Sequence, residues 1–196
     1  MSVGDVQRVH RSCVWILAGT GLLVVAGGQL FSQASSARDV LKRFCDLDAR
    51  GEQLTPDGWQ KVAALFVAPA SPRRDKVLVV KDFVVSLPAV EKGRDDFYVE
   101  YIQLGLIEPS QARFSALPPV KVRAGFSVVR EPAPGAGRGT TEAEKPGEWR
   151  ITGPVPAPHL TVDTATRYAS ELRANARDAA TRNNADQMLA ALKRLR

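Results

Sequence analysis

The chain has few of the residues that most often carry chemistry. Its 196 residues include two cysteines and two histidines, and aromatic residues make up 7%. Cys13 lies in an N-terminal apolar stretch, so the rest of the chain keeps only Cys45 and cannot form an internal disulfide. We find no catalytic motif and no metal-binding spacing of histidine, cysteine and carboxylate residues. The sequence therefore predicts a domain that is held together by core packing, with no metal and no cofactor.

The N-terminal segment is the most informative part of the chain. Arg8 and Arg11 precede a short apolar run over residues 13–28, and small residues follow, including Ala34 and Ala37. A basic start, an apolar core and an exit of small residues are typical of a secretory leader. We therefore predict cleavage at Ala34 or Ala37 and export of the remaining chain to the periplasm or the medium.

The same segment has a second interpretation. A signal core has about 10 to 14 apolar residues and a spanning helix has about 20, and residues 13–28 fall between these lengths. If residues 1–37 are not cut, they form an inner-membrane anchor. Because Arg8 and Arg11 stay inside by the positive-inside rule, the domain lies outside the membrane in both cases. The sequence leaves the signal peptide and the anchor open.

Charge and length limit the classes of partner. The net charge is +6, and the leader contributes two arginines and one aspartate, or +1, which leaves +5 on about 160 residues. That length suffices for one domain with a core. Since exported proteins rarely meet nucleic acid, we interpret the positive charge as a solvated surface and expect no nucleic-acid partner. Membrane contact is expected only through an uncleaved leader.

Hydrophobic periodicity predicts two helices after the leader. Residues 37–49 repeat apolar side chains at steps of three and four, and this helix includes Cys45, which we interpret as a small buried residue. Thr55 and Pro56 are typical of a helix start, and the pattern continues to Phe66. Trp59, on this second helix, is expected to be a core residue.

The middle of the chain has the β-branched and aromatic composition of strands. We predict strands over residues 77–85, 97–107, 120–130 and 148–152, an irregular connection over 109–119 with Phe114 and Leu117 tucked in, and a Pro- and Gly-rich mobile loop over 131–147. Because consecutive strands have short connections, the sheet is expected to be antiparallel.

The C-terminal residues 161–196 are predicted to form two amphipathic helices, separated at Asn183 and Asn184. The last helix has a narrow apolar stripe, which either packs on its own domain or docks on a partner, and we favour docking: Met188, Leu189, Leu192 and Leu195. The element order predicts the α+β class, with the main domain over residues 38–160. We expect a curved sheet of about four strands, with helices from both ends of the chain covering one of its faces.

Four stretches carry a resemblance to a known family: VLKRFCDLDARGE (residues 40–52), TPDGWQKVAALF (55–66), FYVEYIQLGLI (97–107) and GEWRI (147–151). This pattern is two helices, the second with a tryptophan, followed by a curved sheet. It resembles the nuclear-transport-factor-2-like superfamily, which has a cystatin-like cone fold. The chain would be an exported, bacterial-type member. The resemblance implies a cavity between the sheet and the first helices. Within that cavity, it makes Trp59, Tyr98 and Tyr101 the candidate ligand-binding residues.

The resemblance does not select one function, because this fold hosts enzymes, dimers and docking domains. Alternation along the strand places Tyr98 and Tyr101 on opposite faces, and Asp82 is expected to be solvated, so no acid–base pair follows. We therefore expect an exported non-catalytic domain that binds a protein partner or a small hydrophobic ligand, or that forms a homodimer through the sheet or the C-terminal helix. The alternative is a cavity enzyme, isomerase- or dehydratase-like, that acts on a small hydrophobic molecule.

Overall fold

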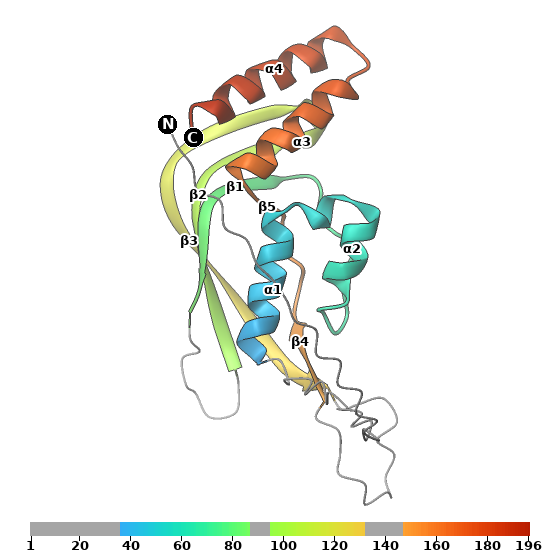
Figure 1. Ribbon diagram of the computed structural model, residues 1–196, viewed down its shortest axis with the longest axis vertical. Coiled ribbons are helices and arrows are strands. Elements are labelled where there is room, and N and C mark those ends of the chain that lie inside the picture. The colour runs from blue at the N-terminus through green and yellow to red at the C-terminus, as the bar shows by residue number, and fades with distance from the viewer. Residues whose placement is uncertain (1–35, 87–94, 132–146) are drawn as a thin grey trace, which may run out of the picture. The chain divides into compact units, whose positions relative to one another are not determined.

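The computed structural model describes residues 36–86, 95–131 and 147–196, which belong to one compact unit (Figure 1). Nearly all of the predicted leader and of the Pro- and Gly-rich loop lies outside the described residues. None of the helices in these three ranges is both long and apolar enough to cross a membrane.

The predicted α+β class is confirmed. The elements are α1 (Ala37–Ala49), η1 (Glu52–Leu54), α2 (Pro56–Ala63), β1 (Val77–Val85), β2 (Asp95–Glu108), η2 (Pro109–Gln111), β3 (Arg113–Glu131), β4 (Glu148–Thr152), β5 (His159–Thr161), α3 (Val162–Ala174) and α4 (Ala179–Lys193). The strand order in the curled sheet is β4-β3-β2-β1-β5. All neighbouring strands are antiparallel except β1 and β5, which are parallel.

The bounds of the first helices follow from their caps. Ser36 and Asp39 form a capping box at the start of α1, with Ser36 N donating to Asp39 Oδ2 over 2.9 Å. The predicted bounds of α1 are confirmed. Helix α2 ends at Ala63, before the predicted end at Phe66, because the chain turns to pair with β4. There Ile151 N donates to the Leu65 carbonyl over 2.8 Å.

The predicted connection over residues 109–119 is wrong beyond η2, because β3 already begins at Arg113 and runs for 19 residues. It tolerates Pro118 and Pro119 because its pairing with β2 is irregular between Ala116 and Val120 and because β4 pairs only with residues 127–131. Neither neighbouring strand therefore needs the N–H groups that the prolines lack. Leu117 is 42% exposed, which corrects the expectation that it is tucked in. Strand β5 was not predicted, because its three residues are too short to show a period.

The predicted break at Asn183 and Asn184 is also wrong. Both residues lie within α4, and the boundary falls between Asn175, the C-cap of α3, and Asp178, the N-cap of α4. The two asparagines are exposed and so leave the apolar face intact. That face packs on its own domain, since Met188 is 2% and Leu192 0% exposed, which corrects the expectation that this stripe docks elsewhere.

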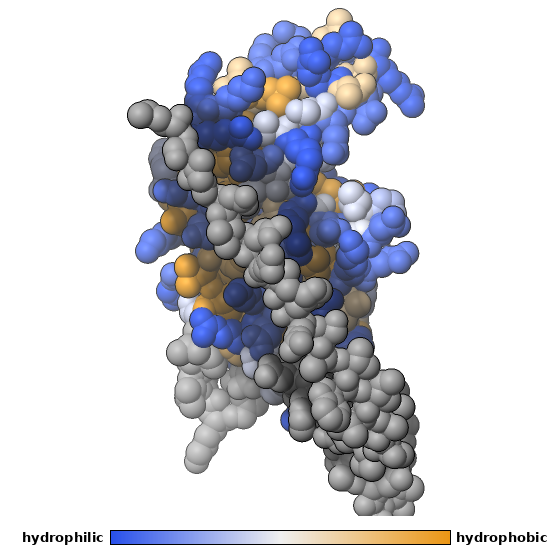
Figure 2. All heavy atoms as spheres, viewed as in Figure 1, coloured by the Kyte–Doolittle hydropathy of each residue, from blue (hydrophilic) through white to orange (hydrophobic). Residues whose placement is uncertain are grey.

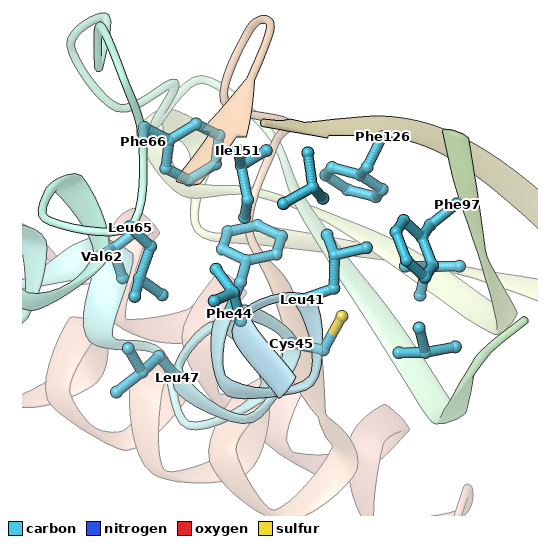
Figure 3. Close-up of a cluster of buried hydrophobic side chains, with 14 of the residues drawn as sticks. Leu41, Phe44, Cys45, Leu47, Val62, Leu65, Phe66, Phe97, Phe126 and Ile151 are labelled. Atoms are coloured by element: carbon cyan, nitrogen blue, oxygen red, sulfur yellow. The ribbon is translucent and has the colours of Figure 1, made fainter. Parts of the chain in front are cut away.

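Two hydrophobic clusters lie on opposite faces of the sheet. Tyr101 belongs to one cluster and its neighbour Ile102 packs against the other, and successive strand side chains point to opposite faces. The concave cluster lies under α1 and α2 and includes Leu41, Phe44, Val62, Phe66, Phe97, Tyr101, Phe126 and Ile151 (Figure 3). The convex cluster lies under α3 and α4 and includes Val77, Val79, Ile107, Leu160, Ala165, Ala169, Ala185, Met188 and Leu192.

The two helix pairs therefore cover different faces, which corrects the expectation of one shared face. The sheet bends so that α1 and α2 lie inside its curve, while α3 and α4 lie outside it (Figure 1). Hydrophilic residues dominate the outer surface of α3 and α4 (Figure 2). One sheet thus supports two separate cores.

Candidate functional site

A buried polar cluster lies where α1, η1, β2 and β5 meet. Asp48 is 1% exposed, Gln53 0% and His159 5%, and these three are the buried polar side chains among the described residues. Burying such groups is costly unless they pair with one another. Their contacts therefore decide whether the cluster is a structural element or a reactive site.

The local turn brings these residues together. Asp48 lies on the last turn of α1, on the same buried face as Phe44. The chain then turns at Gly51, whose φ of 81° lies in the left-handed region that favours glycine. A Cβ at Gly51 would also lie 3.3 Å from side-chain atoms of Leu160 and Thr164. The turn places Gln53, in η1, back against the carboxyl group of Asp48.

Both oxygens of the Asp48 carboxyl group have partners. Oδ1 accepts hydrogen bonds from Gln53 Nε2 over 2.7 Å and from the backbone N–H of His159 over 3.1 Å. Oδ2 and His159 Nδ1 lie 3.0 Å apart and form a hydrogen bond. These contacts tie α1 and η1 to β5 across 111 residues of sequence. Gln53 Oε1 is left buried without a protein partner.

Tyr101 extends the cluster towards the concave core. Its ring stacks on His159, with centroids 4.0 Å apart and planes 8° from parallel. Its hydroxyl group lies 3.8 Å from Cys45 Sγ. Cys45 is 1% exposed, which confirms its interpretation as a small buried residue. The order of contacts is thus Gln53, Asp48, His159, Tyr101 and Cys45.

Burial dominates the electrostatics of this cluster. It raises the pKa of Asp48 above its usual value of 3.8, and the hydrogen bonds from His159 and Gln53 only partly oppose this. Burial also raises the pKa of the Cys45 thiol to about 12 and raises the pKa of Tyr101. The thiol and the phenol therefore stay protonated at neutral pH, and a protonated thiol is a poor nucleophile.

An aspartate that orients a histidine is also the arrangement of a general base. Such a base needs a substrate within hydrogen-bond reach, and here the histidine ring lies under Tyr101 and beside α1. No residue of the cluster lines the hollow between η1 and α3 or the hollow between α4 and β3. The cluster can therefore fix the position of β5 against α1, but it presents no group to these hollows.

The two hollows differ in chemistry. The hollow between η1 and α3 has a volume of about 250 Å³ and is lined by charged and polar groups, including Arg50, Glu52, Arg167 and Glu171. The hollow between α4 and β3 has a volume of about 420 Å³ and is lined by Arg113, Phe114, Met188 and Arg194, among others. No group of three or more histidine, cysteine or carboxylate residues that could hold a metal ion occurs in residues 36–86, 95–131 and 147–196.

The structure separates the three candidate ligand-binding residues. Trp59 is half-buried and packs against the concave cluster, whereas Tyr101 is fully inside it. Tyr98 lies on the other face of β2, 38% exposed, with Arg123 over its ring at 5.4 Å. None of the three lines either hollow. Asp82 is exposed, as expected, and accepts a hydrogen bond from Phe83 N over 2.7 Å.

Sequence reasoning missed Asp48, Gln53 and His159. One signal was present, because Asp48 shares the helical spacing of Leu41 and Phe44 and is therefore an acidic residue on an apolar face. His159 offered no such signal, since its partner lies 111 residues away.

Comparisons with known proteins add no family to this geometry. The chain matches no protein-family model, no curated protein and no solved structure.

Proposed function

We propose that this chain is an exported, non-catalytic domain that binds a partner, which is one of the functions that the nuclear-transport-factor-2-like resemblance allows. The observation that carries the proposal is the closure of the Asp48–His159 pair. It is the one buried acid–base pair among the described residues, and both side chains are almost inaccessible. Because a substrate has no access to these side chains, we assign the Asp48–His159 pair a role in stabilising the fold and none in catalysis.

The start of α1 supports cleavage of the leader at Ala34. The capping box uses Ser36, and Ala37 is 7% exposed within the concave cluster. Cleavage after Ala37 would remove both residues, and the loss of an N-cap costs about 1 kcal/mol. Cleavage after Ala34 would keep them. N-terminal sequencing of the exported protein tests this, and a start near Met1 in the membrane fraction would favour the anchor.

The alternative, a cavity enzyme, is favoured by one observation. Asp48 and His159 have the contact that orients a general base, with Oδ2 and Nδ1 3.0 Å apart. For this function, a small hydrophobic molecule would have to reach the imidazole ring from the concave side. Reagent access to His159 therefore separates the two functions.

The experiment is carbethoxylation of the full chain by diethyl pyrocarbonate, read for His159 by peptide mass spectrometry. We expect no modification of His159 in the folded protein and full modification after unfolding in urea, because the folded ring is 6% exposed. The urea sample is the control for the intrinsic reactivity of this histidine. Modification at similar rates in both samples would contradict the proposal and favour the enzyme.

A further inference from the structure

The first part of β3 has an open edge. Strand β3 pairs with β2 from Arg113 to Val128, but its other edge pairs with β4 only from Ser127 onward. Residues 113–126 therefore pair on that edge with no strand of the described chain. An unpaired edge presents backbone N–H and C=O groups to any extended segment that approaches it.

Part of this edge is blocked by its own sequence. Pro118 and Pro119 have no backbone N–H and so remove donors from the edge. The remainder, residues 120–126, is called here the open edge of β3. It contains no proline, so the N–H groups of alternate residues, those that face away from β2, stay available to a partner. It also has the length of an ordinary strand.

The side chains of the open edge differ between the two faces of the sheet. One face of the open edge is apolar. Val122 pairs with Tyr101 and Ala124 pairs with Val99, so both lie on the concave face of the sheet, and Val120 follows the same alternation. Val120 is 51% exposed although it is apolar. The opposite face carries Lys121 and Arg123, and both are exposed. A segment added to this edge would therefore meet apolar side chains on one face and positive charge on the other.

The positive face argues against a second copy of the chain as the partner. Two copies paired edge to edge would bring Lys121 and Arg123 close to the same residues of the other copy, and like charges across strands are destabilising. Arg123 Nη2 is 2.6 Å from Glu100 Oε1, so one cation is partly compensated. Lys121 has no ion pair with any described residue. Charge complementarity therefore favours an acidic partner.

We propose that the open edge of β3 binds an extended peptide segment of a partner protein in which acidic and apolar side chains alternate. The segment pairs as an added strand, with its apolar side chains over Val120 and Val122 and its carboxylates beside Lys121 and Arg123. This inference rests on the proposed partner-binding function and names the class of partner. Backbone pairing supplies affinity, and the lysine and arginine select against neutral and basic strands.

The test uses a labelled, end-capped peptide of about six residues that alternates valine and glutamate. We expect the full chain to bind it about tenfold more tightly than the matching valine–lysine peptide, because two cross-strand charge pairs change sign. Fluorescence anisotropy measures both affinities. Amide hydrogen exchange should show new protection in the complex at alternate residues of 120–126, those whose N–H groups face away from β2.

The variant Lys121→Glu should lose this preference for the glutamate peptide. Lys76→Glu is the matched control, since Lys76 is also exposed but precedes β1, and it should bind like the wild type. Equal binding by Lys121→Glu, no binding by the wild type, or protection of every amide of residues 120–126 before any peptide is added would overturn the proposal. If the peptide fails to bind and His159 stays unmodified by diethyl pyrocarbonate, the edge proposal falls and the proposed function stands.

Discussion

The concave and convex clusters differ in what fills them. The concave cluster is aromatic and borders a polar cluster, with Phe44 at its centre, 5.4 Å from the ring of Phe66 and 5.6 Å from that of Phe126. The convex cluster contains aliphatic side chains and three buried alanines where the helices approach: Ala165, Ala169 and Ala185. One face is filled by large rings and fixed by hydrogen bonds, and the other by close helix packing.

The two faces of the sheet are specified in different ways. On the concave face, Asp48 must make three hydrogen bonds to residues of two other elements, so a misplaced β5 would leave a buried carboxyl group unpaired. On the convex face, the alanines set only how near α3 and α4 can lie. We therefore expect the concave face to be sensitive to loss of atoms or charge, and the convex face to be sensitive to added volume.

Truncation of the largest side chains should give the largest effect. Phe44→Ala should lower the free energy of unfolding by about 3 to 5 kcal/mol, because its ring is fully buried among other rings. Leu192→Ala, at 0% exposure on the convex face, should cost about 2 to 4 kcal/mol. Urea unfolding followed by circular dichroism measures both. A loss below about 1 kcal/mol for Phe44→Ala would contradict the assignment of a concave core.

Removal of the buried carboxyl group should be nearly as costly. Asp48→Ala leaves the donors of Gln53 and His159 without their acceptor and should cost about 3 kcal/mol. Asp46→Ala is the matched control, because Asp46 is an exposed neighbour on the same helix, and it should change stability by less than about 0.5 kcal/mol. Equal losses in the two variants would mean that the polar cluster adds nothing specific.

Added volume should distinguish the convex face. Ala169→Leu places three extra carbons where the side chain is 0% exposed and should cost about 1 to 3 kcal/mol by overpacking. Ala174→Leu, at the exposed end of the same helix, should have little effect. Thermal melts of the two variants make the comparison. If Ala169→Leu melts like the wild type, α3 does not pack closely on this face.

The pH dependence of stability should show the raised pKa of Asp48. Its folded carboxyl group keeps a proton that the unfolded chain has already released above the usual pKa of 3.8. Raising the pH through this window therefore favours the unfolded state and removes stability. The stability of the wild type relative to Asp48→Asn should fall as the pH rises from about 4 towards neutrality. Urea unfolding at several pH values measures the difference, and an increase with pH would contradict it.

Local signals in the sequence predicted the elements that they specify. Helix α1 and strand β1 have the predicted bounds, since one has a cap and helical spacing and the other a β-branched run between polar residues. The length of β3 was missed because two prolines resemble a break when it is not known that the strand is at an edge. The helix break predicted at Asn183 and Asn184 was wrong for a similar reason. Both side chains are exposed, and the sequence does not show that exposure.

The candidate site was much harder to predict than the fold. Of the residues proposed from the resemblance, only Tyr101 contacts the polar cluster, through His159 and Cys45. The pairing of Asp48 with His159 depends on β5, whose parallel partner β1 lies far away in the sequence. The spacing of residues along the sequence does not reveal a contact between residues that are 111 positions apart. The sequence therefore showed no sign of this acid–base pair.

A double-mutant cycle on the Asp48–His159 pair, with Asp48→Ala, His159→Ala and the double variant, decides whether the pair stabilises the fold. If the pair is a structural tie between α1 and β5, each single variant is strongly destabilising. The double variant should then cost less than their sum by at least about 1 kcal/mol. Single losses below about 0.5 kcal/mol, or losses that add without coupling, would contradict a structural role for the pair.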